Sequence, residues 1–247
     1  TGSDLNGMAA FNAGMQIRGR MAKVAADHFG VGEDIITFRE GRVHANNESV
    51  SFGELAKMSW LKRVQLSEAG FYKTPKIHWD GKTMRGRPFF YFSYGAAVAE
   101  VAIDTLTGET RCLRADIVQD IGTPLNPAID LGQIEGAFVQ GMGWLTCEEL
   151  WWDKEGRLRT VGPSTYKIPG SRDVPPVFNV SLLDQMPNKE ETVFRSKAIG
   201  EPPLMLAISV WLAIRDAIAS IGGNRFAPDL EAPATPEHVL EAVGKLR

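Results

Sequence analysis

The 247-residue sequence is 44% hydrophobic and 23% charged, with a formal net charge of −3. These values are typical of a globular protein with a sizeable apolar core. Lys and Arg do not cluster among aromatic residues, as they do in many proteins that bind nucleic acid. No apolar run reaches the roughly 18–20 residues of a membrane span, and the N-terminus has no charged and then apolar export signal. We therefore expect no nucleic acid and no membrane as a partner, and a cytoplasmic location.

Capping residues, turns and apolar periodicity predict the elements in chain order. The first half contains a core-facing helix from Ser3 or Asp4 to near Gly30, a hairpin around Gly41, a capping-box helix from Ser51 to about Leu66, and a long hairpin with arms 89–103 and 109–119. The second half contains a helix over 129–150, a strand over 177–183, a helix after Pro203 and a last helix from Thr235 to about Leu246.

This order of elements predicts an α+β fold class, with mixed sheets, a long hairpin and packed helices. The chain begins at Thr1, without an initiator Met, directly before a helical pattern. We therefore expect residues 1–247 to be the C-terminal fragment of a larger domain. One large domain and two packed lobes of about 1–120 and 121–247 both fit the sequence.

Residues that bind metals directly are scarce. Cys112 and Cys147 lack the paired spacing of zinc or iron–sulfur sites, and the four histidines form no HExxH motif. We predict that both cysteines are free thiols and that no metal is held by protein ligands.

Glu201 lies between Gly200 and the pair Pro202–Pro203, at the start of an apolar helical run. Proline fixes its own φ and disfavours helical geometry in the residue before it, which predicts an extended Glu201 and a helix that starts at Pro202 or Pro203. A helix N-terminus favours a carboxylate by about 0.3–1 kcal/mol. The carboxylate is either a catalytic base or a helix cap, and the octapeptide alone leaves both possible.

The helix over 129–150 carries an unusual face. Gln133, Gly136, Ala137 and Gln140 are spaced at i, i+3, i+4 and i+7, which brings two amides and two small side chains together. This face predicts either a surface that a flat ligand approaches closely, or close helix packing through glycines with the glutamines bonded to neighbouring backbone.

Six stretches in this order resemble the molybdenum-cofactor-binding part of the xanthine dehydrogenase family, within the molybdenum hydroxylases. They are residues 2–7, 70–75, 94–101, 125–141, 162–169 and 196–203. The resemblance covers nearly the whole chain. Aldehyde oxidases of the same group typically carry a glycine-containing pair in place of Pro202–Pro203, so the purine branch is the better match.

The resemblance implies an oxidoreductase that hydroxylates purines, from hypoxanthine to xanthine to urate, at a molybdenum–molybdopterin centre. It implies that Glu201 is the general base, that Gln133 approaches the molybdenum, and that Gly200 contacts the cofactor. The pterin dithiolene, rather than protein ligands, would hold the metal.

The resemblance also implies that Thr1, Gly2 and Ser3 end a loop that wraps the pterin. The partners it implies are the N-terminal part of the molybdenum-binding region, a purine substrate, and domains or subunits that carry FAD and 2Fe-2S clusters. We expect this chain alone to be inactive. Two alternatives stay open: a sister hydroxylase for aldehydes or other N-heterocycles, and a non-catalytic assembly or interaction module.

Overall fold

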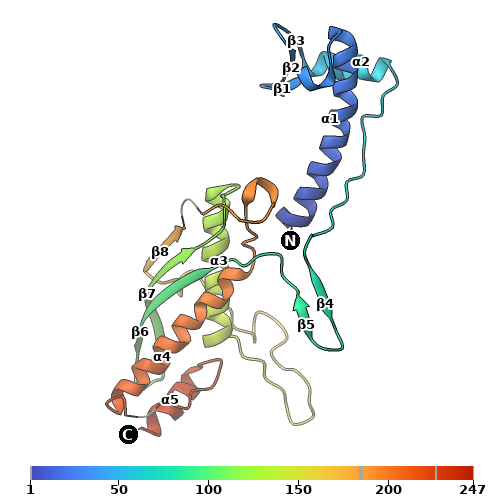
Figure 1. The fold of residues 1–247 in the computed structure, drawn as a ribbon. Coiled ribbons are helices and arrows are strands. Elements are labelled where there is room, and N and C mark those ends of the chain that lie inside the picture. Colours follow the sequence, from blue (N-terminus) through green and yellow to red (C-terminus); the bar gives the residue numbers. More distant parts are fainter. Residues whose placement is uncertain (1, 184–185, 226, 247) are drawn as a thin grey trace. The chain divides into compact units, whose positions relative to one another are not determined.

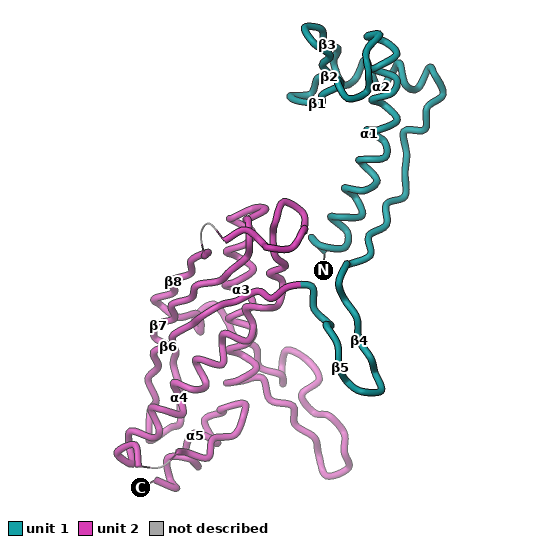
Figure 2. The backbone as a smooth tube through the Cα atoms, viewed as in Figure 1, with its two compact units in different colours: residues 1–90 teal, residues 91–247 magenta. Residues whose placement is uncertain are grey.

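The computed structural model describes residues 2–183, 186–225 and 227–246. The chain divides into two compact units, residues 1–90 and 91–247 (Figures 1 and 2). Helices combine with small antiparallel sheets in the first unit and with a mixed sheet in the second. The predicted α+β class is therefore confirmed.

The first unit consists of a long helix with a small core at its C-terminal end. Its helical segments are a π-helical turn at Gly2–Asn6, α1 (Gly7–Phe29), a 3-10 turn at Glu33–Ile35, and α2 (Phe52–Leu61). Its antiparallel strands are β1 (Thr37–Arg39), β2 (Arg42–Ala45), β3 (Glu48–Ser51), β4 (His78–Asp80) and β5 (Arg85–Arg87). The core side chains include Met21, Val24, Ile36, Val43 and Leu55.

The helix boundaries and burial that local sequence signals predict for the first unit are correct only in part. The capping box before α2 is confirmed, and Gly30 ends α1 in the left-handed region at φ 65°. The predicted cap at Ser3 or Asp4 is wrong, because α1 begins at Gly7 after the π-helical turn. The core-facing prediction fails for the N-terminal half of α1, where Phe11 is 53% exposed.

An extended segment runs along α1 after α2. A Cβ on Gly70 would lie 1.8 Å from the carbonyl oxygen of Ala9, so the close approach requires glycine. Asn12 donates to the Phe71 carbonyl at 2.8 Å, and Arg20 donates to Glu68 at 2.7 Å. These contacts hold one of the six stretches that carried the family resemblance.

The second unit is a three-stranded sheet with helices on one face (Figure 1). Its strands are β6 (Gly95–Ile103), β7 (Thr110–Gln119) and β8 (Val177–Leu182). Its helical segments are α3 (Pro127–Thr146), the 3-10 turns η3 (Val193–Arg195) and η4 (Pro202–Ala207), α4 (Ile208–Ile221) and α5 (Pro236–Gly244). The predicted long hairpin, helices and strand are confirmed at these positions.

The sheet has the order β6-β7-β8, with β6 antiparallel and β8 parallel to β7. Alternation along each strand directs Ala115 and Ile117 of β7 toward α3 and α4, where they meet Phe138 and Ile214 in the core. The opposite face is open, and Val98 on it is 69% exposed.

The units divide at residue 90, whereas the sequence suggested a boundary near 120. The physical reason is that the β6–β7 hairpin belongs to the same core as the helices that follow it. A hairpin strand buries its apolar face against whichever element packs on it, and the chain order of the elements does not reveal that partner.

Residues 202–221, which comprise η4 and α4, form a helical stretch long and apolar enough to cross a membrane by length and composition alone. The expectation that no apolar run reaches this length is therefore corrected. Val210, Ile214 and Ile218 of this stretch are buried in the core of the second unit. A core helix of a globular domain satisfies the same criterion.

Candidate functional site

The two faces of helix α3 differ in how closely other atoms approach. Asn126 caps the helix, and its side chain accepts from the Ile129 N–H at 3.4 Å. A Cβ on Gly141 would lie 2.4 Å from the Leu204 carbonyl oxygen, so η4 packs directly on the helix there. A Cβ on Gly132 or Gly136 would meet nothing within 4 Å.

The open face of α3 carries the predicted site residue Gln133. Gln133, Gly136 and Gln140 are all exposed, whereas Ala137 is buried and belongs to the packed side. Among the described residues, neither glutamine side chain has a hydrogen-bond partner. Close packing through glycine is therefore confirmed at Gly141. The predicted hydrogen bonds from the two glutamines to neighbouring backbone are not found among the described residues, and the ligand-facing interpretation of this face stays a prediction.

Glu201 occupies the N-cap position of η4, with φ −123° and ψ −14°. The predicted extended conformation is wrong, because the Leu204 N–H donates to the Glu201 carbonyl at 3.0 Å and closes a turn. The predicted helix start at Pro202 is confirmed. The carboxylate makes no capping hydrogen bond, so the helix-cap interpretation of this residue is not supported.

Gly200 and Glu201 are both exposed in this chain. Immediately after them, Leu204 and Ala207 are buried against Gly141 of α3. The backbone at Glu201 therefore leads into a packed turn, while the Glu201 side chain projects from the protein. Because η4 packs on α3, Gln133 and Glu201 come from adjacent elements of one unit.

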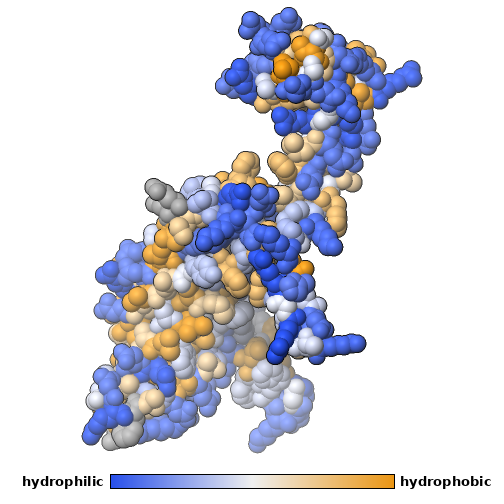
Figure 3. Space-filling model, in the orientation of Figure 1, coloured by the Kyte–Doolittle hydropathy of each residue, from blue (hydrophilic) through white to orange (hydrophobic). Residues whose placement is uncertain are grey.

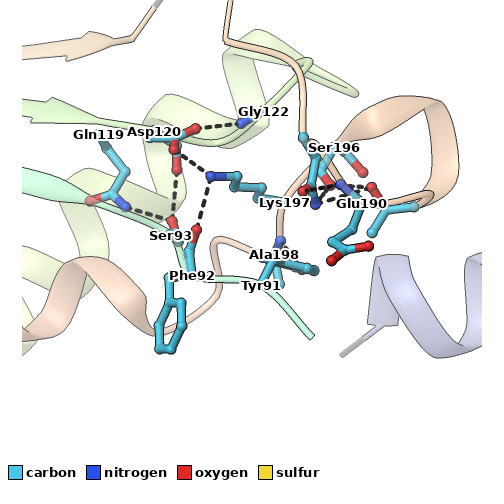
Figure 4. A network of polar contacts seen from close by, with 12 residues as sticks. Tyr91, Phe92, Ser93, Gln119, Asp120, Gly122, Glu190, Ser196, Lys197 and Ala198 are labelled. Atoms are coloured by element: carbon cyan, nitrogen blue, oxygen red, sulfur yellow. Dashed lines mark hydrogen bonds and ion pairs between the residues drawn. The ribbon is translucent and has the colours of Figure 1, made fainter. Parts of the chain in front are cut away.

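A buried polar network precedes this turn (Figure 4). Lys197 forms an ion pair with Asp120, and their side chains are only 10% and 4% exposed. The Lys197 ammonium also donates to the Phe92 carbonyl at 2.9 Å. The Tyr91 hydroxyl accepts from the Ala198 N–H at 2.7 Å. Sequence reasoning did not identify this network.

A second set of contacts surrounds Ser196, one residue before Lys197. Its carbonyl accepts from the Asn188 side-chain amide at 3.1 Å, and its hydroxyl donates to the Val193 carbonyl at 2.7 Å. Gly122 faces this loop at φ 64°, and a Cβ there would lie 2.4 Å from the Arg195 carbonyl oxygen. The chain that leads to Glu201 is therefore closely packed on its sheet side.

The remaining predicted contacts lie elsewhere in the chain. Gly2 and Ser3 belong to the π-helical turn of the first unit. Thr1 lies outside the described residues. Gln133, Gly200 and Glu201 share the second unit.

Within the described ranges, no three His, Cys, Asp or Glu residues group as metal ligands. Cys112 and Cys147 are free thiols, and burial raises the pKa of each. A group that brings its own metal ligands would need exposed backbone and unpaired amides from this protein. The open face of α3, with Gly136 beside Gln133, fits that requirement.

Residues 1–175 match the family described as molybdopterin cofactor-binding domain. Xanthine dehydrogenase/oxidase of Felis catus is 52% identical over 205 residues, which are 79% of this chain and 15% of the relative. Xanthine dehydrogenase of Dictyostelium discoideum is 46% identical over 245 residues, which are 96% of this chain and 16% of the relative. This chain therefore spans about one sixth of the length of these relatives.

The solved structure of a Cu,Mo-CO dehydrogenase superposes with a TM-score of 0.76 and 20% identity, over 98% of this chain and 29% of that one. At this identity, the likeness shows the fold. The resemblance to xanthine dehydrogenases that six sequence stretches predicted is confirmed by the two relatives. Because the family match covers residues 1–175 of 247, the chain belongs to the molybdopterin cofactor-binding domain family.

Proposed function

We propose that this chain is the part of a purine hydroxylase that supplies the general base, Glu201. The observation that carries the proposal is a carboxylate with no protein partner among the described residues, at the start of a helix packed on α3. The high identity to xanthine dehydrogenases supports purines as the substrate class. An unpaired carboxylate is the group expected of a proton acceptor.

When bound, a molybdenum–molybdopterin group supplies the oxygen-transfer and electron-accepting chemistry. In this proposal Gln133 and Gly200 contact that group, and Thr1, Gly2 and Ser3 stay proposed contacts of the pterin. Glu201 accepts the proton of the oxygen nucleophile that attacks the electron-poor purine carbon. The amide of Gln133 both donates and accepts hydrogen bonds, which suits a contact to a polar ligand.

The proposal includes partners, because this chain spans 15% and 16% of two relatives. Exposed apolar residues occur along the N-terminal half of α1, where Phe11 and Met15 are 53% and 43% exposed. Apolar side chains also reach the surface of the second unit (Figure 3). We propose that the N-terminal part of the molybdenum-binding region covers such surfaces. FAD and 2Fe-2S clusters are proposed on other domains or subunits, and the location is proposed to be cytoplasmic.

The test is Glu201→Gln in the longer, cofactor-loaded enzyme. Glutamine keeps the size of the side chain but accepts no proton, so purine turnover should fall by about 10²–10⁴-fold. Molybdenum and pterin content should remain at the wild-type level. Steady-state kinetics with hypoxanthine and metal analysis of the same preparation provide the two readouts.

Glu237→Gln is the matched control, because Glu237 is an exposed carboxylate in the first turn of α5. Its turnover should stay within about twofold of wild type, the range expected of a group outside the reaction. Turnover by Glu201→Gln within about threefold of wild type would remove Glu201 from the mechanism. A preparation without molybdenum would favour the assembly-module alternative. Faster oxidation of aldehydes than of purines would favour the sister hydroxylase.

A further inference from the structure

The segment before Glu201 is fixed to the sheet by backbone hydrogen bonds. The Lys197 N–H donates to the Ile121 carbonyl at 2.8 Å, and the Thr123 N–H donates to the Arg195 carbonyl at 2.9 Å. An isolated bridge joins Gly122 to Ser196. The chain therefore runs beside the end of β7 until it reaches Lys197.

The side chain of Lys197 adds a buried link at this point (Figure 4). Its ammonium pairs with Asp120 and donates to the Phe92 carbonyl at 2.9 Å. Asp120 also accepts from the Gly122 N–H at 3.0 Å within the turn after β7, so the ion pair joins this turn to the Lys197 segment, and the ammonium joins both to the Phe92 segment. Apolar residues of similar size often stabilise a core as well as a buried ion pair does, so stability alone does not account for this pair.

Beyond Lys197, the Ala198 N–H is bonded to the Tyr91 hydroxyl at 2.7 Å. Three residues then lead to Glu201, a span that cannot exceed roughly 11 Å when fully extended. After Glu201 the chain enters η4, which packs on Gly141. The position of the carboxylate is therefore limited by two fixed points, one of which is the Lys197 network.

We propose that Lys197 is a positioning residue for Glu201, an inference that rests on the proposed function of Glu201. Lys197 acts through the backbone, because its ammonium holds the start of the short span while the Glu201 side chain remains unpaired. A misplacement of a reacting group by about 1 Å can cost about 10²-fold in rate. Loss of the Lys197 link should therefore lower kcat without removing the base.

The main variant is the double substitution Lys197→Met with Asp120→Asn in the longer, cofactor-loaded enzyme. Asparagine leaves no unpaired buried charge and still accepts from the Gly122 N–H. We expect kcat to fall by about 10- to 100-fold while KM changes by less than about threefold. Molybdenum content and melting temperature should stay near wild type. The conservative single substitution Lys197→Arg, with Asp120 unchanged, should give a kcat between those of the double variant and the wild type.

The matched control removes an exposed ion pair in the same way. Lys62 and Asp27 pair at 3.3 Å with side chains 50% and 71% exposed. Lys62→Met with Asp27→Asn should leave kcat within about twofold, because exposed pairs contribute little. Tyr91→Phe is a second test with the buried pair intact, and should lower kcat by about threefold through loss of the Ala198 hydrogen bond.

Unchanged kcat in the Lys197/Asp120 double variant would overturn the inference. A kcat that falls only in proportion to lost molybdenum or folded protein would assign a structural role and would also overturn it. If Glu201→Gln is inactive while the double variant is fully active, the proposed function stands and this inference fails. If Glu201→Gln is active, the proposed function itself fails.

Discussion

Two carboxylates stand at helix starts in different regions of the molecule, and their surroundings differ. In α2, Glu54 accepts from the Ser51 N–H at 2.8 Å and from the Ser51 hydroxyl at 2.7 Å. These bonds hold the pKa of Glu54 below its usual value, with the backbone bond as the larger cause. Glu201 stands at the start of η4 with no hydrogen-bond partner in the part of the chain that the structure describes.

The available donors explain the difference. An N-cap side chain accepts from the second or third N–H of its helix. After Glu201 the second position is Pro203, which has no N–H, and the third is Leu204, whose N–H already binds the Glu201 carbonyl at 3.0 Å. Closeness to a helix start therefore does not make a carboxylate a cap. The tandem prolines leave this one free for another partner.

The largest expected effect is a difference in purine turnover between substitutions of the two carboxylates. Glu54→Gln should leave purine turnover of the longer enzyme within about twofold, whereas Glu201→Gln should lower it by about 10²–10⁴-fold. The reason is that the charge of Glu54 serves its own helix. Steady-state kinetics of both variants at equal molybdenum content provide the measurement. A similar loss in both variants would erase the distinction.

Pro203→Ala should convert Glu201 toward a cap. The substitution restores the second N–H, and a cap hydrogen bond of about 1 kcal/mol would compete for the carboxylate and lower turnover by about fivefold. Pro202→Ala is the control, because the first N–H of a helix is not the one that an N-cap side chain binds. Kinetics of the two variants, with melting temperatures to account for the lost ring, test this. Equal turnover in both would contradict the explanation.

Ser51→Ala should weaken α2 rather than catalysis. Removal of an N-cap hydroxyl costs about 1 kcal/mol, which corresponds to roughly fivefold faster local opening. Hydrogen exchange of the amides over 52–61 provides the measurement. Lys57→Ala, at an exposed position of the same helix, is the control and should leave exchange nearly unchanged. Equal exchange in Ser51→Ala and wild type would show that the capping box adds nothing.

The smallest expected effect is the pH dependence of the contribution that Glu54 makes to the stability of α2. Because the pKa of Glu54 is lower in the folded protein than in the unfolded chain, its contribution to stability is present above the unfolded pKa. The contribution is lost as pH falls through the lower, folded pKa. The difference in α2 protection between wild type and Glu54→Gln, compared at equal pH, should therefore be largest near neutrality and shrink in acid. A difference that grows in acid would reverse the assigned sign.

The sequence predicted the elements whose signals are local. The capping box at Ser51, the hairpin turn at Gly41 and the helix start at Pro202 each depend on a few adjacent residues. Short strands such as β4 and β5 have three residues each and leave no periodic pattern, so they were missed. The exposed half of α1 was missed because an apolar stripe does not reveal what covers it.

The site was predictable only in part. The octapeptide over 196–203 made Glu201 a candidate base, and periodicity made the face with Gln133 a candidate ligand surface; both roles stay predictions. The network that holds Lys197 was not predictable, because Asp120 lies 77 residues away in sequence and Tyr91 lies 107 residues from Ala198. Such pairs depend on how β7 and the segment before β6 meet in space, and this sequence contains no local signal for that meeting.

The most direct measurement is a crystal structure of the longer protein with its cofactor and a bound purine. The account predicts that the Glu201 carboxylate, exposed in this chain, lies in a closed site there. Its oxygens should be within direct or single-water hydrogen-bond reach, about 2.6–3.2 Å per bond, of the reacting groups. A Glu201 side chain that still faces bulk solvent in the loaded enzyme, or bonds to another part of the protein away from the purine, would contradict the account.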